Sequence, residues 1–507
     1  MKTTTMHPDR FYSIFCLAAA LAVPGFAQSA AAPSVAAHPA SYRELHYPPI
    51  NDLKVPEPVR FELPNGLVVY LIEDHELPKV SLQVIVRAGA REEPAEKTGL
   101  AAITGMVMRT GGSASRSGDQ LDDELDHLGA SIETNIDTDS GGVYATMLKE
   151  DLDRGIAIVA DLLQHPAFPA DKLELAKIQL RDSIARRNDE PSGIAFREFS
   201  KILYGKDSPY ARQAEYATIE AITRDDLVAF HARFFQPENV ILGVAGDFDT
   251  AGLRPKIEMA LGGWARGGRP NPGVPLVGPR AQTHLGGTAL GAPKAKPREV
   301  YSVVKTDMQQ SWVLMGMLGG RRDDPDYHAL QVMNEILGGG FSSRLFSNVR
   351  SAQGLAYSVF SGWNAEWDHN GTFYAGGSSK PETTLGIYRA ILAEVKRMAE
   401  GGATDDEVAR AKDSILKGFA FEFDHTHKII SRLMAYEYYG YPKDYLQQYH
   451  TRIKQVTKDD VARVARKYLT PDNFAVLFSG NGQYEAPLAS LGAVTPIDIT
   501  IPPPKHP

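Results

Sequence analysis

The chain has 507 residues, which is too long for a single hydrophobic core and predicts two to four domains. Its formal net charge of −8 and its lack of any long basic run argue against nucleic acid as a partner, because phosphate binding requires clustered Lys and Arg. A composition of 43% hydrophobic and 23% charged residues is typical of a globular protein.

The first segment of the chain has the pattern of a secretory signal peptide. Lys2 and Arg10 precede an apolar run over residues 11–23, and small residues follow up to Ala27. A charged start, a short apolar stretch and a small-x-Ala end define such a peptide. We therefore expect residues 1–27 to be removed and the mature protein to be periplasmic. The alternative, an uncleaved membrane anchor, needs an apolar run of about 20 residues.

Cleavage at any of the candidate sites would remove the one cysteine of the chain. Cleavage is expected after Ala27, with Ala30 and Ala32 as alternative sites. Cys16 is the only cysteine, and the bulky Phe15 before it is unsuited to lipidation. Since Cys16 lies in the removed segment, the mature chain has no thiol, which excludes disulfides and Cys-ligated metals. No later segment is long and apolar enough to span a membrane.

Strand-like and helix-like patterns are mixed along the rest of the chain. Residues 28–50, rich in Ala, Pro and Ser, are expected to form a loose spacer. Alternating apolar residues predict strands at 67–72, 80–86, within 131–147, at 240–244 and at 474–478, and helical periodicity predicts a helix at 171–187. Because the two patterns do not alternate strictly, we expect an α+β fold in which helices cover one face of a sheet.

An internal repeat indicates that one domain has been duplicated. Four short segments recur in the same order at a nearly constant offset of about 230 residues. The pairs are 91–94 with 322–325, 174–177 with 410–412, 223–227 with 457–461, and 237–239 with 471–473. Any single pair has little weight, but the collinear order of all four is hard to obtain by chance.

A segment crowded with Gly and Pro separates the two copies. Residues 267–299 cannot sustain a helix or a strand, and we interpret them as a linker. The linker divides the chain into an N-terminal domain at 51–266 and a C-terminal domain at 300–484, which a Pro-rich tail at 485–507 follows.

A succession of short motifs opens the first domain. Asn65-Gly66 comes first, then Gly89-Ala90-Arg91-Glu92-Glu93-Pro94, then Gly99-Leu100-Ala101. This succession resembles the two-domain bacterial type of the pitrilysin/insulinase/mitochondrial-processing-peptidase family of zinc peptidases (inverzincins), over residues 55–480. The resemblance implies two duplicated domains of about 230 residues. Each has a mostly antiparallel sheet covered by helices, and together they form half of a clam shell.

The zinc-binding motif of that family is missing from this chain. In the family, Gly-Leu-Ala continues into His-x-x-Glu-His, in which two His bind zinc from one helix face and the Glu activates water. Here the three functional positions are Ala102, Gly105 and Met106, none of which can do this chemistry. The family's third ligand, a later Glu, falls on Asp182 or Ser183, depending on the alignment. We therefore expect no zinc and no other cofactor in this chain.

The remaining histidines offer no substitute site. None of the 14 His forms a familiar zinc-binding spacing. His127 follows Asp126 in an amphipathic helix, where a solvated face is the expected position. His425 and His427 lie in a helical stretch, in which side chains two residues apart diverge.

The second half keeps a block that family members use at their active site. Gly338-Gly339-Gly340-Phe341 precedes Arg350, and Tyr357 follows seven residues after Arg350. By resemblance, Arg350 and Tyr357 point into the chamber between domains and bind the substrate carbonyl. A guanidinium and a phenol can both donate hydrogen bonds to a developing oxyanion and so stabilise a transition state. The structural alternative is that Arg350 caps a helix and Tyr357 packs in a strand.

One half of a peptidase site is therefore present and the other half is missing. In bacterial relatives the two halves can lie on different chains that pair. The resemblance implies a non-zinc subunit of a periplasmic heteromeric zinc metallopeptidase, inactive alone, with a homologous zinc-bearing peptidase subunit as its partner and peptides as substrates. The alternative is a catalytically inactive scaffold or peptide-binding protein. An unrelated activity has little support, because the chain has neither a Gly-x-Ser-x-Gly elbow nor a Walker loop.

Overall fold

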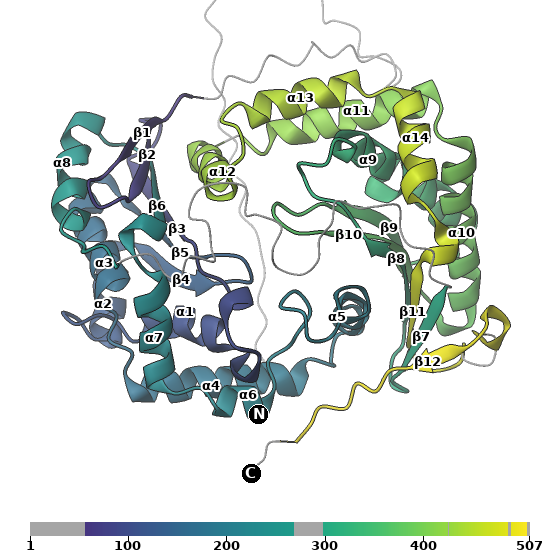
Figure 1. The fold of residues 1–507 in the computed structure, drawn as a ribbon, viewed down its shortest axis with the longest axis horizontal. Helices are drawn as coiled ribbons and strands as arrows, with labels where there is room; N and C mark the ends of the chain where they lie inside the picture. The colour runs from purple at the N-terminus through teal and green to yellow at the C-terminus, as the bar shows by residue number, and fades with distance from the viewer. Residues whose placement is uncertain (1–55, 268–297, 424, 485–487, 504–507) are drawn as a thin grey trace, which may run out of the picture. The chain divides into compact units, whose positions relative to one another are not determined.

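Two six-stranded mixed sheets carry the fold in the computed structural model (Figure 1). The structure describes residues 56–267, 298–423, 425–484 and 488–503, and all of them belong to one compact unit that begins at Leu53. The predicted signal peptide, the spacer and most of the predicted linker lie outside these residues. Within the described ranges, none of the helices has the length and apolarity needed to cross a bilayer.

The first sheet has the strand order β1-β2-β6-β3-β5-β4. Only β2 and β6 are parallel neighbours, and every other adjacent pair is antiparallel. The strands are β1 (Val59–Glu62), β2 (Val68–Glu73), β3 (Lys79–Val86), β4 (Ser131–Ile136), β5 (Gly141–Leu148) and β6 (Val240–Gly246). The central strand β6 is buried along its whole length, whereas β4 forms one edge of the sheet.

Helices of the first half cover one face of this sheet. Apart from α5 (Pro191–Tyr204), which packs on the second sheet, they are α1 (Leu100–Thr110), α2 (Gly118–Leu128), α3 (Leu152–Gln164), α4 (Ala170–Arg186), α6 (Tyr216–Glu220), α7 (Arg224–Phe234) and α8 (Thr250–Leu261). Their apolar faces share one core with the sheet, in which Ile103 of α1 and Leu227 of α7 pack with Leu242 of β6. The helix predicted at 171–187 is confirmed as α4.

The second sheet repeats the arrangement, with the strand order β12-β7-β11-β8-β10-β9. Its strands are β7 (Glu299–Val304), β8 (Ser311–Leu318), β9 (Ser358–Asn364), β10 (Thr372–Ser379), β11 (Ala475–Gly480) and β12 (Val494–Pro496). Its helices are α9 (Tyr327–Asn334), α10 (Thr384–Gly401), α11 (Asp405–Ala420), α12 (Thr426–Tyr439), α13 (Tyr445–Gln455) and α14 (Lys458–Tyr468). The sheet is mostly antiparallel, which confirms the predicted α+β fold with two duplicated domains.

The sequence repeat corresponds to the same local structure in both halves. Thr223 is the N-cap of α7, where its side chain accepts a hydrogen bond from the backbone N–H of Asp226 and the Asp226 carboxylate bonds back to Thr223. Thr457 and Asp460 form the identical capping box at the start of α14. Such boxes satisfy N–H groups that the first helical turn leaves unpaired, so the repeated letters mark two helix starts.

One helix of each half packs on the sheet of the other half (Figure 1). Helix α12 packs on β2, β3 and β6, and it lies so close to β6 that a Cβ at Gly243 would be 2.4 Å from Sδ of Met434. In the opposite direction, Phe199 of α5 packs with Leu314 and Leu477 of the second sheet. Because these contacts are apolar and buried, each sheet is covered on both faces.

The C-terminal segment adds a strand to the second sheet and then contacts the first half. In the predicted Pro-rich tail, β12 pairs with β7 in parallel. Beyond it, the carbonyl oxygen of Ile499 accepts a hydrogen bond from the Asn188 side chain at 2.8 Å, and Ile501 packs against the core of the first half. Residues 494–501 therefore join the two halves.

Candidate functional site

The helix α1 begins at the turn that the sequence motif predicts. Gly99, its N-cap, has a φ of 110°, a conformation that glycine adopts without steric cost. The buried carboxylate of Glu93 accepts hydrogen bonds from the backbone N–H of Gly99 at 3.0 Å and of Ala101 at 2.9 Å. These hydrogen bonds pair N–H groups that the first turn of a helix leaves unsatisfied, so the Glu93-Pro94 turn fixes where α1 starts.

Helix α1 approaches the edge strand β4 too closely for a side chain at the middle position of the lost motif. A Cβ on Gly105 would lie 2.7 Å from the backbone nitrogen of Ile136 and 2.9 Å from the carbonyl carbon of Asn135. Ala102 and Met106, one helical turn apart, are half-buried and offer no nitrogen or carboxylate ligand. The residues of α1 therefore do not fit a catalytic zinc ion. They offer no ligand atoms, and the close approach to β4 leaves no room for a side chain at Gly105.

The two candidates for the third ligand position lie on the exposed side of α4. The buried face of α4 is formed by Leu173, Ala176, Lys177 and Ile184. Asp182 is exposed and pairs with Arg186 on the same helix at 3.3 Å, and Ser183 is exposed as well.

The histidines weighed in the sequence have local roles in the structure. His127 lies on α2, where its Nδ1 is 2.7 Å from the backbone oxygen of Asp123. His425 precedes α12 and its ring stacks on that of His427, with the ring centres 5.6 Å apart.

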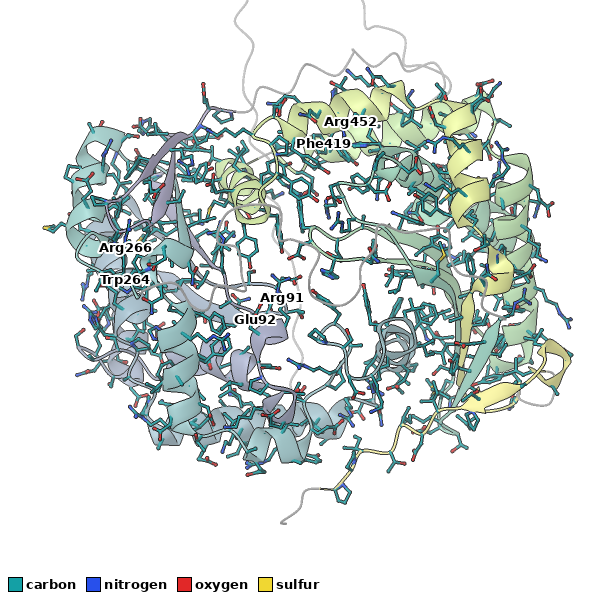
Figure 2. All side chains as sticks on the ribbon, in the orientation of Figure 1. Arg91, Glu92, Trp264, Arg266, Phe419 and Arg452 are labelled. Carbon is teal, nitrogen blue, oxygen red and sulfur yellow. The ribbon has the colours of Figure 1, made fainter. Side chains whose placement is uncertain are left out.

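One group of residues that the sequence did not single out has metal-like spacing. The ligand atoms of Asp139, Asp368 and His369 all lie within 4.8 Å of one another, the single such group among the described residues. Arg91, which is labelled in Figure 2, already pairs with both carboxylates, since its Nη1 lies 3.0 Å from Asp139 Oδ1 and 2.8 Å from Asp368 Oδ2. The group is therefore an ion-pair network between the two halves.

The pKa values in this network follow from burial and charge. Burial raises the pKa of the Asp139 carboxyl, although the charge of Arg91 opposes that rise. Burial also acts to raise the pKa of Asp368, but hydrogen bonds from His369 and Arg91 outweigh it and leave that pKa lowered. Breaking the network by removing Arg91 would leave two carboxylates partly buried without their cation.

In the second half, the block that carries Arg350 contains two π-helical segments. The segment η6 (Glu335–Gly339) continues α9, and η7 (Phe346–Ala352) carries Arg350. Such wide turns are rare and are often found at functional sites. Within η6, a Cβ on Gly338 would lie 2.4 Å from the backbone nitrogen of Ser361 in the edge strand β9. The glycine block thus brings this helix end against the edge of the second sheet.

Arg350 and Tyr357 are both exposed to solvent. The Arg350 guanidinium lies over the ring of Phe346, with Cζ 4.7 Å from the ring centre, and Phe346 in turn contacts Phe341 edge to face. Tyr357 lies directly before β9, is 50% exposed, and donates its backbone N–H to Ser378 of β10. Neither side chain forms a hydrogen bond or ion pair within the part of the chain that the structure describes. Arg350 therefore does not cap a helix through its side chain.

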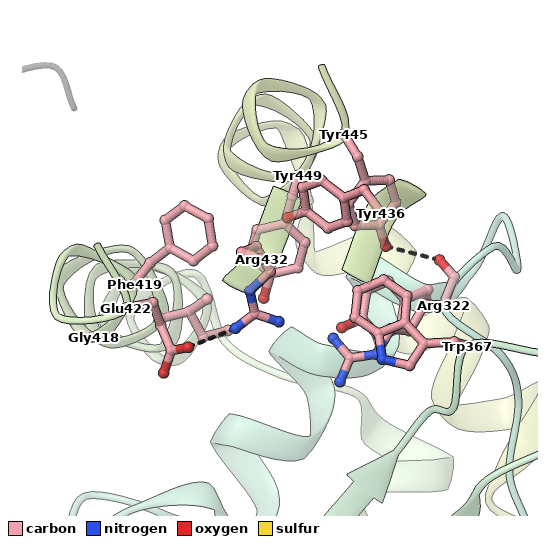
Figure 3. A pocket seen from close by; sticks show the side chains of 11 residues that line it. Arg322, Trp367, Gly418, Phe419, Glu422, Arg432, Tyr436, Tyr445 and Tyr449 are labelled. Atoms are coloured by element: carbon pink, nitrogen blue, oxygen red, sulfur yellow. Dashed lines mark hydrogen bonds and ion pairs between the residues drawn. The ribbon is translucent and has the colours of Figure 1, made fainter. Parts of the chain in front are cut away.

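The structure also forms a cavity that the sequence did not predict. It is lined by aromatic residues from α9, α11, α12 and α13 and by Arg322, near Trp367 in the loop between β9 and β10 (Figure 3). Its residues span positions 322–449, so no local motif marks it.

Sequence comparisons give this chain a family. Residues 68–213 match the model described as "Insulinase (Peptidase family M16)", and residues 221–415 match "Peptidase M16 inactive domain". The chain is similar to an uncharacterized zinc protease of Mycobacterium tuberculosis, with 29% identity over 429 residues, 84% of this chain and 94% of the relative. It is also similar to the uncharacterized zinc protease YmxG of Bacillus subtilis, with 24% identity over 83% of this chain and 98% of the relative.

Solved structures share the fold. A crystal structure described as a peptidase M16 inactive domain from Pseudomonas fluorescens matches with a TM-score of 0.71 and 24% identity, over 84% of this chain and 98% of that one. A protease from Helicobacter pylori matches with a TM-score of 0.69 and 19% identity, over 84% of this chain and all of that one.

Proposed function

Because this chain belongs to the M16 (insulinase/pitrilysin) peptidase family, we propose that it is the non-zinc subunit of a heteromeric metallopeptidase that degrades or processes peptides. Its partner is a homologous subunit that carries the zinc. The observation that carries the proposal is the contrast between its two halves. Helix α1 has no metal-ligand atom at the motif positions, whereas Arg350 and Tyr357 are exposed beside the edge strand β9 and their side chains form no hydrogen bond or ion pair with the described residues.

The proposed role of the second half is to bind the carbonyl group of the scissile bond. Arg350 can donate N–H groups and Tyr357 its hydroxyl to an oxygen on which negative charge develops. These donors lower the barrier only if they bind the transition state more strongly than the substrate. The charge of Arg350 serves this purpose because the developing oxyanion is negative and the substrate carbonyl is neutral. The partner's zinc would supply the activated water.

We place this activity in the periplasm. The support is the signal-peptide pattern of residues 1–27. A test of export is the N-terminal sequence of the protein recovered from the periplasmic fraction, which should begin just after Ala27, Ala30 or Ala32.

Reconstitution tests the proposal directly. The purified chain alone should contain no stoichiometric zinc and cleave no peptide, and mixing it with a two-domain M16 protein of the same genome that has an intact His-x-x-Glu-His should produce peptidase activity. Arg350→Ala should lower kcat of the mixture by about 10²- to 10³-fold, the usual cost of removing one oxyanion donor. Tyr357→Phe should also lower kcat, while co-purification of the two chains stays unchanged.

The matched control is Arg410→Ala, which removes an exposed Arg from α11. It should leave kcat unchanged. Full activity of both Arg350→Ala and Tyr357→Phe would refute the proposed role of these residues. If the two chains co-purify and yet no variant and no mixture shows activity, the protein is instead a scaffold of the same fold.

A further inference from the structure

A cavity of about 390 Å³ lies within the second half, and its wall is mostly aromatic (Figure 3). Tyr327, Trp367, Phe419, Tyr436, Tyr445 and Tyr449 line it. This volume is within the range of pockets that hold small organic ligands. Aromatic walls favour a planar or apolar group, because they bury large areas and offer ring faces for stacking.

One cation of this cavity has no anion of its own. The guanidinium of Arg322 lies over the ring of Trp367, with Cζ 4.3 Å from the ring centre. Its Nε is shielded from solvent and has no hydrogen-bond partner, and no carboxylate of the described residues forms an ion pair with it. The other cation, Arg432, pairs with Glu422 at 2.6 Å. The adjacent Arg321 likewise pairs with Asp323.

The cavity lining therefore carries one net positive charge. Its phenols are neutral at neutral pH, since burial raises the pKa of Tyr436 to about 12 and raises those of Tyr445 and Tyr449 as well. Glu366 lies outside the lining, and burial raises the pKa of its carboxyl despite the opposing charge of Arg322. The shielded Nε–H of Arg322 has no acceptor, so this guanidinium favours an anion, and a carboxylate matches its planar array of donors.

We propose that this cavity binds the C-terminal residue of a peptide, with the free carboxylate on Arg322 and an aromatic side chain against the cavity wall. The choice of a peptide as the carboxylate-bearing ligand depends on the proposed function, whereas the recognition of an aromatic carboxylate depends on the cavity alone. In this arrangement the second half holds one end of a peptide at a site separate from Arg350 and Tyr357.

The test compares two peptides that differ only at the C-terminus. Isothermal titration calorimetry with the purified chain alone would measure the binding of Ala-Ala-Phe with a free carboxylate and of Ala-Ala-Phe-amide. We expect the free acid to bind at least about tenfold more tightly, the usual contribution of a hydrogen bond to a charged group. Equal binding of both peptides, or binding of neither, would overturn the proposal.

Two variants locate the effect. Arg322→Gln should remove the preference for the free acid, while Arg321→Gln, which lacks only a neighbouring paired cation, should keep it. An acid preference that survives in Arg322→Gln would also refute the assignment. If Arg322→Gln does not fold, as judged by circular dichroism, Trp367→Leu takes its place and should weaken binding of both peptides.

This experiment separates the inference from the proposed function. It needs no partner subunit and no activity. If reconstitution fails while the purified chain still distinguishes acid from amide, the peptidase proposal falls and the carboxylate site stands. The opposite result leaves the peptidase proposal intact without this site.

Discussion

The two halves of the molecule differ most where a helix meets the edge of its sheet. In the first half, α1 passes β4 as a regular helix, and Gly105 allows the contact. In the second half, the helix after α9 changes to π-helical turns, Gly338 contacts β9, and the chain then presents Arg350 and Tyr357. A duplicated fold has thus kept the same packing contact twice, but only the second edge presents the pair Arg350 and Tyr357.

The largest loss of stability is expected at Gly105, where α1 lies against the backbone of β4. Gly105→Glu would place a Cβ and a charge against the backbone of β4, so we expect a loss of at least about 3 kcal/mol in the free energy of unfolding. Urea denaturation would measure it. Ala102→His, at a half-buried position, should cost far less.

This prediction extends to restoring the motif. The triple variant Ala102→His/Gly105→Glu/Met106→His should not gain stoichiometric zinc, as measured by metal analysis of the folded protein. A stable triple variant that binds zinc would contradict this prediction. It would show that the close approach of α1 to β4 does not prevent a zinc site and that only the side chains are missing.

At the second edge, Gly338→Ala should destabilise the protein by about 1–3 kcal/mol, because a Cβ there overlaps the backbone nitrogen of Ser361. The control is Gly340→Ala, whose Cβ would have ordinary contact at 3.4 Å from Glu335 and should be tolerated. Thermal unfolding of the two variants provides the comparison, and equal stability would contradict the close contact.

The two edges should respond to acid with opposite signs. In the second half, Arg344 follows the glycine block, and its hydrogen bond to Glu407 in the first turn of α11 lowers the pKa of Glu407 to about 2. Its contribution is present above the unfolded pKa of about 4.3 and is lost as pH falls towards 2. At the first edge, burial raises the pKa of Glu93, so its contribution is present at low pH and is lost as pH rises through the folded pKa.

Glu407→Gln should therefore make the stability of the protein less dependent on pH between about 4.3 and about 2, and it should cost about 1–2 kcal/mol at neutral pH after allowance for solvent screening. Urea titrations at several pH values would measure both. An unchanged slope would show that this ion pair does not control acid unfolding.

The smallest loss of stability is expected from removing Arg109, which contacts the edge strand β4. Arg109 donates its Nε–H to the carbonyl oxygen of Ile132 in β4 at 2.6 Å and pairs with Asp122. Arg109→Ala should cost about 1 kcal/mol, the net value of such a hydrogen bond. Hydrogen exchange should report faster exchange in β4, with unchanged exchange in β9 as an internal control.

Local patterns predicted most of the elements but not how they assemble. Alternating residues gave the positions of β2, β3 and β6, and the repeated Thr/Asp pairs marked the starts of α7 and α14, because these signals depend on neighbours in sequence. The sequence could not show that α5 packs on the sheet of the second half and α12 on the sheet of the first half. An amphipathic pattern shows that one face of a helix is buried, but it does not show against which surface.

The candidate site shows the same limit. The lack of metal ligands at Ala102 and Met106 can be read from the sequence. Arg350 and Tyr357 were predicted from a resemblance that the comparisons confirm at the level of the family. The close approach at Gly105 and the unpaired cation at Arg322 depend on residues far apart in the chain, such as Ile136 and Trp367. These contacts require the three-dimensional structure.

The exchange of helices has a consequence for the making of the protein. Val68, Tyr70 and Ile241 of the first sheet are buried by residues of α12, and the ribosome completes α12 only about 190 residues after the end of β6 at Gly246. At a synthesis rate of about 5–20 residues per second, this apolar face stays uncovered for roughly 10–40 s. Until α12 is available to cover this face, we expect the chain to be prone to aggregation and to depend on a holding chaperone during synthesis and export.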